Sequence, residues 1–435
     1  MGNAQPGPHG KQGPSLLPAL VCLEHGASDV ERAVVTALAM SIIDSPEFDI
    51  TETVENCNAM YWACLKGLNA VALRLLDVGG IDVDTGDERT GTTALWWACY
   101  RGLATVALRL LKTGCVRVAV KDTTHGTTPL FWACNHGLEA VSMLLLDIGG
   151  VDVDAKDTRT GTTPLFWACN RGLSKVALRL VGYGGVDVDV KACHSGTNPL
   201  RQACARGLEA VAMRLLDRGG VDVDATDSQT GTTPLYWVCA QRLGAVALRL
   251  LDIGGVDVDA TDSRNGTTPL WWACHNGLGE VALRLLGDGV IDPDAKHRDG
   301  TTPLFWACEQ GLGAVSLELL DGGGVDTRAE HSTHCRSLVD WAHANSLDLV
   351  AARIVAIQQS TAPEAMTVIG RRLVVGRRLD ALDSKSLVSG ARKPAGHDSA
   401  RASLLEGDGL ADPRDVDAAT RFEGSQDPQV VPQLL

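Results

Sequence analysis

The stretch GTTPLFWACNRGL, residues 161–173, recurs along the chain with few changes. It returns as GTTALWWACYRGL at 91–103, GTTPLFWACNHGL at 126–138, GTTPLYWVCAQRL at 231–243, GTTPLWWACHNGL at 266–278 and GTTPLFWACEQGL at 300–312. The residue before Pro-Leu, or its equivalent, falls at Thr93, Thr128, Thr163, Asn198, Thr233, Thr268 and Thr302. These positions are 35 residues apart, except for one step of 34. A fixed period of this size is typical of a solenoid built from stacked repeats.

Each unit is predicted to fold as two helices followed by an extended loop. Thr163 suits an N-cap and Pro164 the first helical position, where its missing N–H costs nothing. Gly172 is expected to end this first helix. The next segment, LSKVALRLVGYGG, has an apolar stripe typical of a helix, formed by Leu173, Val176, Leu178 and Leu180. The remainder, VDVDAKDTRTG, alternates between apolar and acidic residues and then contains turn-forming residues. The expected fold class is therefore an all-α repeat solenoid.

These units resemble the ankyrin repeat. The matching features are T-P-L, Ala at the sixth place, the inter-helix Gly and Val, then Leu-Leu, Gly and Asp-Val-Asp-Ala. The family period is about 33 residues, and the extra residues here fall in the loop. The resemblance spans residues 58–357 and about eight full repeats. It implies a curved stack with projecting loops, typically used to hold other proteins on its concave face and loop tips.

One column departs from the family pattern. The family's His is replaced by Tyr61, Trp96, Phe131, Phe166, Arg201, Tyr236, Trp271 and Phe305. The next column is Trp in almost every repeat: Trp62, Trp97, Trp132, Trp167, Gln202, Trp237, Trp272, Trp306 and Trp341. We interpret the Trp column mainly as packing between repeats, with a partner-binding aromatic strip as the alternative.

A cysteine column and an aspartate column run through the same repeats. Eight cysteines, Cys64, Cys99, Cys134, Cys169, Cys204, Cys239, Cys274 and Cys308, are expected to be reduced and buried. Neighbouring repeats are about 8–10 Å apart, too far for a disulfide. Thiol reagents are expected to reach chiefly Cys57, Cys115, Cys193 and Cys335, which lie off this column. The paired aspartates of the VDVD segments are expected to bond turn backbone rather than calcium.

Polar residues vary after the Ala-Cys pair, at equivalent places that we expect to be exposed. Specificity for a protein partner can lie there, and free drift of solvated positions is the alternative. The repeat at 198–232 also breaks the aromatic pattern, either as a binding centre or as a softer joint. Arg201 is expected to be exposed or paired, since burying it alone would be costly. The candidate partner-binding residues are Tyr100, Arg101, His136, Arg171, Arg201, Gln202, Arg206, Gln241, His275, Asn276 and Gln310.

The ends of the chain differ from the array. Residues 1–14 are expected to be disordered, and 15–57 to form a degenerate capping repeat with helices near 19–27 and 29–43. The tail, 358–435, is expected to be mostly disordered. Its segment 366–388 fits a basic amphipathic helix for a partner, a nuclear-entry signal or a solvated helix. The start MGNAQP only partly matches an N-myristoylation motif, because its sixth residue is Pro.

Composition narrows the functional classes. The net charge of −14 disfavours a general role on nucleic acid or anionic membrane, and no apolar run is long enough to span a bilayer. Reduced thiols favour a cytoplasmic or nuclear location. We expect a monomeric, non-enzymatic scaffold without cofactor or metal. The alternative is a metal-dependent or hydrolytic enzyme that uses the His/Cys cluster at 330–343.

Overall fold

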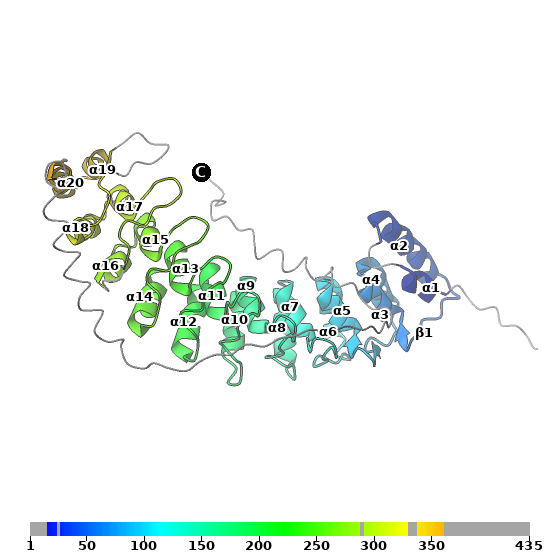
Figure 1. Ribbon diagram of the computed structural model, residues 1–435. Helices are drawn as coiled ribbons and strands as arrows, with labels where there is room; N and C mark the ends of the chain where they lie inside the picture. Colours follow the sequence, from blue (N-terminus) through cyan, green and yellow to red (C-terminus); the bar gives the residue numbers. More distant parts are fainter. Residues whose placement is uncertain (1–14, 24–26, 288–290, 329–336, 361–435) are drawn as a thin grey trace, which may run out of the picture. The chain divides into compact units, whose positions relative to one another are not determined.

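The computed structural model describes residues 15–23, 27–287, 291–328 and 337–360. The predictions for residues 1–14, for the cluster at 330–335 and for the 366–388 segment therefore lie outside the described residues. Every described residue belongs to one compact unit of the chain. Figure 1 shows its helices following one another in sequence order.

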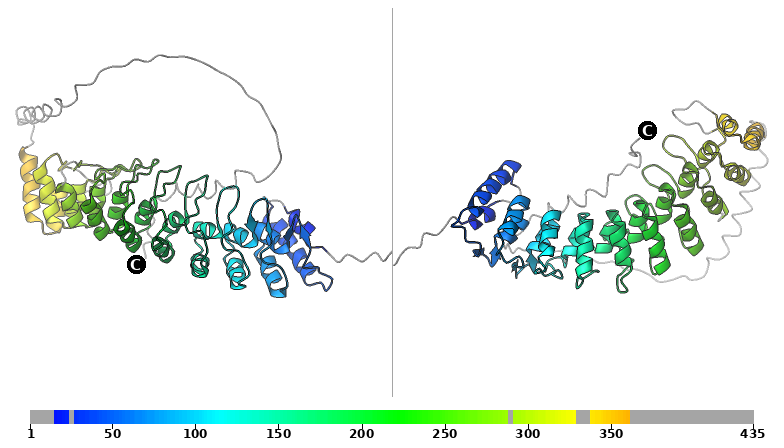
Figure 2. Two further views of the ribbon diagram at one scale, coloured as in Figure 1. Left: turned by 90° about the horizontal axis from the view of Figure 1, so that it is seen from below. Right: turned by 180° about the vertical axis from the view of Figure 1, so that it is seen from behind.

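Two rows of helices form the repeats. The first helices are α3 (Ala59–Leu65), α5 (Ala94–Tyr100), α7 (Pro129–Asn135), α9 (Pro164–Asn170), α11 (Pro199–Ala205), α13 (Pro234–Ala240), α15 (Pro269–His275), α17 (Pro303–Glu309) and α19 (Leu338–Ala344). The second helices are α4 (Asn69–Val78), α6 (Ala104–Lys112), α8 (Glu139–Ile148), α10 (Ser174–Val181), α12 (Glu209–Arg218), α14 (Gly244–Ile253), α16 (Gly279–Gly287), α18 (Gly313–Gly322) and α20 (Asp348–Ser360). First helices pack on first helices and second on second, as the views in Figure 2 also show.

The N-terminal part adds two helices and a short hairpin, and a second hairpin lies between α4 and α5. Helix α1 (Leu17–Val21) packs on α3, and α2 (Asp29–Ile43) packs on α4. The second expected helix, 29–43, matches α2, but the expectation of a helix at 19–27 was wrong, because α1 starts earlier and is only five residues long. Strand β1 (Thr53–Val54) pairs antiparallel with β2 (Cys57–Asn58), and β3 (Gly86–Asp87) with β4 (Thr92–Thr93).

The N-termini of the first helices form as predicted. The Thr163 side chain accepts a hydrogen bond from the backbone N–H of Phe166, and Pro164 occupies the first turn. The helix ends at Asn170, with Arg171 as C-cap, and Gly172 then makes the turn with φ at 76°. Gly91 shows why glycine starts the unit: at its positive φ, a Cβ would lie 2.6 Å from the carbonyl oxygen of Lys121.

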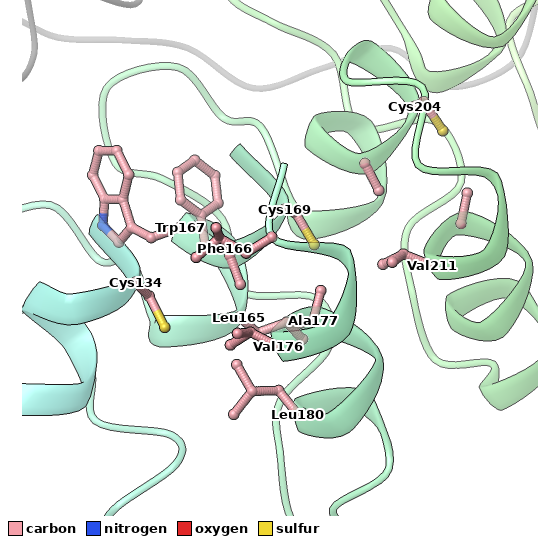
Figure 3. Packing of buried hydrophobic residues seen from close by; sticks show 14 of the residues in the cluster. Cys134, Leu165, Phe166, Trp167, Cys169, Val176, Ala177, Leu180, Cys204 and Val211 are labelled. Carbon is pink, nitrogen blue, oxygen red and sulfur yellow. The ribbon is translucent and has the colours of Figure 1, made fainter. Parts of the chain in front are cut away.

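The core is continuous from one repeat to the next. In α10, Val176, Ala177 and Leu180 are fully buried, whereas Leu178 is only half-buried, so the stripe includes Ala177 in its place. Figure 3 shows Val176, Ala177 and Leu180 facing Leu165 of the first helix, with Cys169 close by. The fold is an all-helical solenoid, as the sequence predicted.

Successive loops are joined by one backbone hydrogen bond at each of several joints. Thr123 N–H donates to Thr90 O at 2.9 Å, and Cys193 N–H donates to Thr160 O at 2.8 Å. Because the donor and acceptor belong to neighbouring repeats, each loop is positioned by the one before it.

Candidate partner-binding surface

The tryptophan column packs between repeats and stays partly exposed. Most of these rings are half-buried, and Trp167 is buried. Five of them meet the aromatic ring of the preceding repeat edge to face, with centroids 5.7 to 6.4 Å apart: the pairs are Tyr61–Trp97, Trp96–Trp132, Tyr236–Trp272, Trp271–Trp306 and Phe305–Trp341. The interpretation as inter-repeat packing is confirmed, and the rings also leave an aromatic strip along the first helices.

Four indoles of the column are also fixed within their own repeats. Trp97 Nε1 donates to Thr92 Oγ1 at 3.1 Å, and Trp167 Nε1 donates to Thr162 Oγ1 at 2.9 Å. Trp132 and Trp237 donate to the equivalent threonines, at 2.9 and 3.1 Å. A threonine five residues upstream therefore sets the orientation of the ring.

Several residues in the column where the family has His also bond the next repeat. Tyr61 Oη lies 3.0 Å from Thr92 Oγ1, and Tyr236 Oη lies 2.9 Å from Thr267 Oγ1. Trp96 Nε1 donates to the carbonyl oxygen of Thr127 at 3.2 Å. Where the residue is Phe131, Phe166 or Phe305, the ring is instead fully buried.

The variable residues that follow the Ala-Cys pair also bond between repeats. At the second of these places, the side chain donates to a carbonyl oxygen at the C-terminal end of the preceding first helix. Arg171 Nε donates to Asn135 O and Arg206 Nε to Asn170 O, each at 2.5 Å. Asn276 Nδ2 donates to Cys239 O at 2.9 Å. Arg101 and Gln241 do the same toward Leu65 O and Ala205 O. Because helix C-termini carry unpaired carbonyls and partial negative charge, these donors stabilise the stack.

The candidate residues differ in how accessible they are. His136, Arg206, Gln241 and Gln310 are exposed, and Tyr100, Arg101, Arg171, His275 and Asn276 are half-buried. Tyr100 stacks on Trp96 with centroids 5.2 Å apart, and His275 stacks on Trp271 at 5.0 Å. Burial lowers the pKa of His275. Arg201 and Gln202 are buried, 7% and 5% exposed, so these two candidates offer little surface to a partner.

Arg201 is paired within the fold. Its guanidinium lies 2.7 Å from Asp227 Oδ2 and donates to Thr232 Oγ1 at 2.9 Å, both in the next repeat. It also lies over the ring of Trp237, 5.4 Å from the centroid. The expectation that Arg201 would be exposed or paired is thus confirmed by pairing.

The aspartate pairs bond turn backbone, as predicted, and they also link repeats. Asp222 Oδ1 accepts from Asp224 N–H within one loop at 3.0 Å. Asp224 Oδ1 then accepts from Asp257 N–H of the next loop at 2.9 Å, and Asp257 Oδ1 accepts from Asp259 N–H at 3.0 Å. This relay across repeats was not foreseen, because the sequence does not show how neighbouring loops are staggered.

The pKa values of the two aspartates in this pair are shifted in opposite directions. Burial raises the pKa of Asp224, and the charges of Asp257 and Asp222 raise it further. The hydrogen bond from Lys191 lowers the pKa of Asp222, whose Oδ2 lies 2.7 Å from Lys191 Nζ. In the described part of the chain, no group of three His, Cys, Asp or Glu side chains is placed to hold a metal ion.

The cysteine column is buried and unpaired by disulfides. All eight members are free and buried, and burial raises the pKa of Cys64 and Cys134 to about 12. Cys115 and Cys193 are exposed as expected, and Cys22 is exposed as well. The expectation that Cys57 would be accessible was wrong, because it packs with Tyr61 and Leu65 and is only 1% exposed. Cys335 lies outside the described residues.

The fold and its joints define a helical repeat protein whose unit is a capped helix pair and a loop. Residues 115–192 and 237–330 match the family model of ankyrin repeats in three copies. These two stretches of the chain are ankyrin repeats. A search of curated proteins found no match. Within the described ranges, no helix combines the length and apolar character needed to cross a bilayer.

Proposed function

We propose that this chain is a non-enzymatic scaffold that binds a protein partner along its first helices and loop tips. Ankyrin repeats are generally protein-interaction modules. The observation that carries the proposal is the row of half-buried Trp rings, which lies beside exposed polar side chains at the C-caps of the same helices. Trp is the residue most enriched at the energetic centre of interfaces, and a polar rim around it gives specificity.

The His/Cys cluster of the enzyme alternative lies mostly outside the described residues. Its described member, His343, is exposed, and its Nδ1 lies 3.1 Å from Asp348 Oδ1. That contact joins α19 to the first turn of α20 and gives the imidazole a structural partner. We therefore favour the scaffold, and the proposed partner surface uses His136, Gln241 and Gln310 as its most accessible polar members.

The test compares partner capture by matched variants of the full chain. One variant replaces His136, Gln241 and Gln310 by Ala on the first-helix row. The control replaces Arg214, Arg249 and Glu318, which are exposed on second helices, by Ala. Quantitative mass spectrometry after proximity labelling should show a partner that is lost from the first variant and kept by the control, with circular dichroism unchanged. Equal labelling by both would place the binding surface elsewhere.

A further inference from the structure

Helix α2, which packs on α4, and helix α20, the last of the second helices, both present an apolar face to solvent. On α2, Val30, Val34 and Leu38 recur every four residues and are 72%, 62% and 49% exposed. Ala33 and Ala37 fill the same face and are also exposed. Residues at this spacing share one side of a helix, so α2 carries a continuous apolar stripe.

Leu38 occupies a position that the rest of the array buries. Asp44 pairs with Arg74 of the next helix, as Asp77 pairs with Arg109, which aligns Leu38 with Val71. Val71 is fully buried, and so are its counterparts Val106 and Val141. Val71 lies one helical turn before Arg74, which contacts Asp44 of the preceding helix, so this side of the helix borders the preceding repeat. The stripe on α2 therefore resembles the side of a second helix that borders the preceding repeat elsewhere in the array.

Helix α20 also exposes an apolar residue at a position that is mostly buried in earlier repeats. Val355 lies 35 residues after Leu320, in a column whose earlier members are mostly buried. Leu320, Leu251 and Leu216 are only 3%, 6% and 5% exposed, whereas Val355 is 36% exposed. Leu349 on the same helix is 75% exposed, with the exposed Ala352 between them. Terminal repeats of a solenoid normally have a polar outer face, whereas these two helices expose several large apolar side chains.

We propose that copies of this chain associate head to tail, with the exposed face of α20 in one copy packing on the exposed face of α2 in the next. This contact would continue the row in which α2 packs on α4 and α18 packs on α20. It goes beyond the partner-binding proposal, uses a different surface, and differs from the monomer expected from the sequence.

The charges at the two faces suit this joint. Along the second helices, an Arg of one repeat pairs with an Asp of the repeat before, as Arg353 pairs with Asp321 at 2.8 Å. At the new joint, the equivalent places are Ser41 on α2 and Ala356 on α20. At these two places neither side would bury an unpaired Arg or Asp, so that desolvation cost does not arise there.

Pairing of α2 with α2 of a second copy fits less well. In an antiparallel pair, Asp29 and Glu31 of each copy would lie beside Asp44 of the other, and these like charges repel. A head-to-tail contact is heterologous and leaves a free face at each end, so it extends into longer assemblies with concentration.

The test uses sedimentation velocity of the full chain across a concentration series. Wild type should sediment faster as concentration rises, and more so at high salt, which screens the repulsion between chains of net charge −14. Val34→Glu and Leu349→Glu should each weaken association by at least about tenfold. Val78→Glu, at a valine 45% exposed within the array, is the matched control and should behave as wild type. Circular dichroism checks that each variant is folded.

Mixing the two variants distinguishes head-to-tail contact from contact between two α2 helices. The intact α20 face of the Val34→Glu chain should bind the intact α2 face of the Leu349→Glu chain, giving dimers that grow no further. A wild type that stays monomeric at every concentration would overturn the proposal and would indicate that another segment or protein covers these faces. Self-association of Leu349→Glu alone, without added dimer in the mixture, would overturn it in favour of contact between two α2 helices.

Discussion

Arg201 and Asp227 form a buried ion pair across two successive repeats, with the guanidinium 2.7 Å from the carboxylate oxygen. Arg201 stands where the other repeats have an aromatic ring, and it keeps the contact with the next Trp through its guanidinium. Asp227 Oδ1 also accepts from the backbone N–H of Gln229, so the pair ties a first helix to the turn of the next loop. The break in the aromatic pattern is therefore a differently built joint, and the contacts give no support to a softer one.

Replacing Arg201 by Met should strongly destabilise the array. It leaves Asp227 without its cation in a place that is only 14% exposed, and losing one partner of a buried pair costs about 3 kcal/mol or more. Urea unfolding measures the change. Arg284→Met is the control, since Arg284 and Asp252 are exposed and their pair should contribute less than about 1 kcal/mol. Equal effects of the two substitutions would mean that the Arg201 pair is effectively solvated.

Neutralising the aspartate relay should change stability in opposite directions at its two positions. The pKa of Asp224 is raised by burial, so its ionisation opposes folding above that raised pKa. Asp224→Asn keeps an acceptor for Asp257 N–H and should raise the free energy of unfolding at pH 7 by less than about 1 kcal/mol. The gain should vanish as the pH falls below the ordinary aspartate pKa, where Asp224 is protonated in both states.

Asp222→Asn should change the free energy of unfolding in the opposite direction. The pKa of Asp222 is lowered by the hydrogen bond from Lys191, so its charged form favours folding above the ordinary aspartate pKa. The variant should be less stable than wild type at pH 7, and the difference should disappear as the pH falls through the lowered pKa. Unfolding curves at a series of pH values test both variants. The same sign for both would contradict the assigned electrostatics.

The fold could be predicted from the sequence because its signals lie within one repeat. Thr163, Pro164 and Gly172 each define a local boundary, and the period shows that the unit is stacked. Contacts between repeats could not be derived in the same way. The relay from Asp224 to Asp257 depends on the stagger of two loops, and the role of Arg171 depends on which carbonyl lies behind it. A signal for the latter was present, since residues at that place are rich in side-chain donors.

Thiol labelling of the native protein should separate two classes of cysteine. Cys22, Cys115 and Cys193 are exposed and should react at once. Cys57 should react slowly, because burial raises its pKa to about 12 and the nearby charges of Asp87 and Glu55 act in the same direction. Mass spectrometry of the labelled peptides measures each rate, with urea-unfolded protein as the reference. Rapid native labelling of Cys64 or Cys134 would contradict the packing of the first helices.

Arg171→Ala should destabilise the joint between α7 and α9. It removes the donor to Asn135 O and the cation over the ring of Trp167, whose centroid lies 5.8 Å away. A cation at a helix C-terminus and a cation–π contact together predict a loss of about 1–2 kcal/mol. Lys175→Ala, at an exposed residue of the same repeat, is the control for thermal unfolding. If Arg171→Ala affects only partner binding, the residue acts mainly as an interface group.

Gln202→Trp should strengthen the joint between α9 and α11. Gln202 Nε2 donates to Thr197 Oγ1 at 3.2 Å, which is the bond that Trp makes five residues after its threonine elsewhere, so an indole can keep it. The new ring would add an edge-to-face contact with Phe166 but lose the bond between Asn170 Nδ2 and Gln202 Oε1. An aromatic pair contributes about 0.5–1.5 kcal/mol beyond its buried area, so we expect a net gain of about 1 kcal/mol and a melting temperature higher by about 1–2 °C. Amide hydrogen exchange in α9 and α11 should also become slower. A lower melting temperature would show that the amide pair is worth more than the ring, and that this joint depends on its polar contacts.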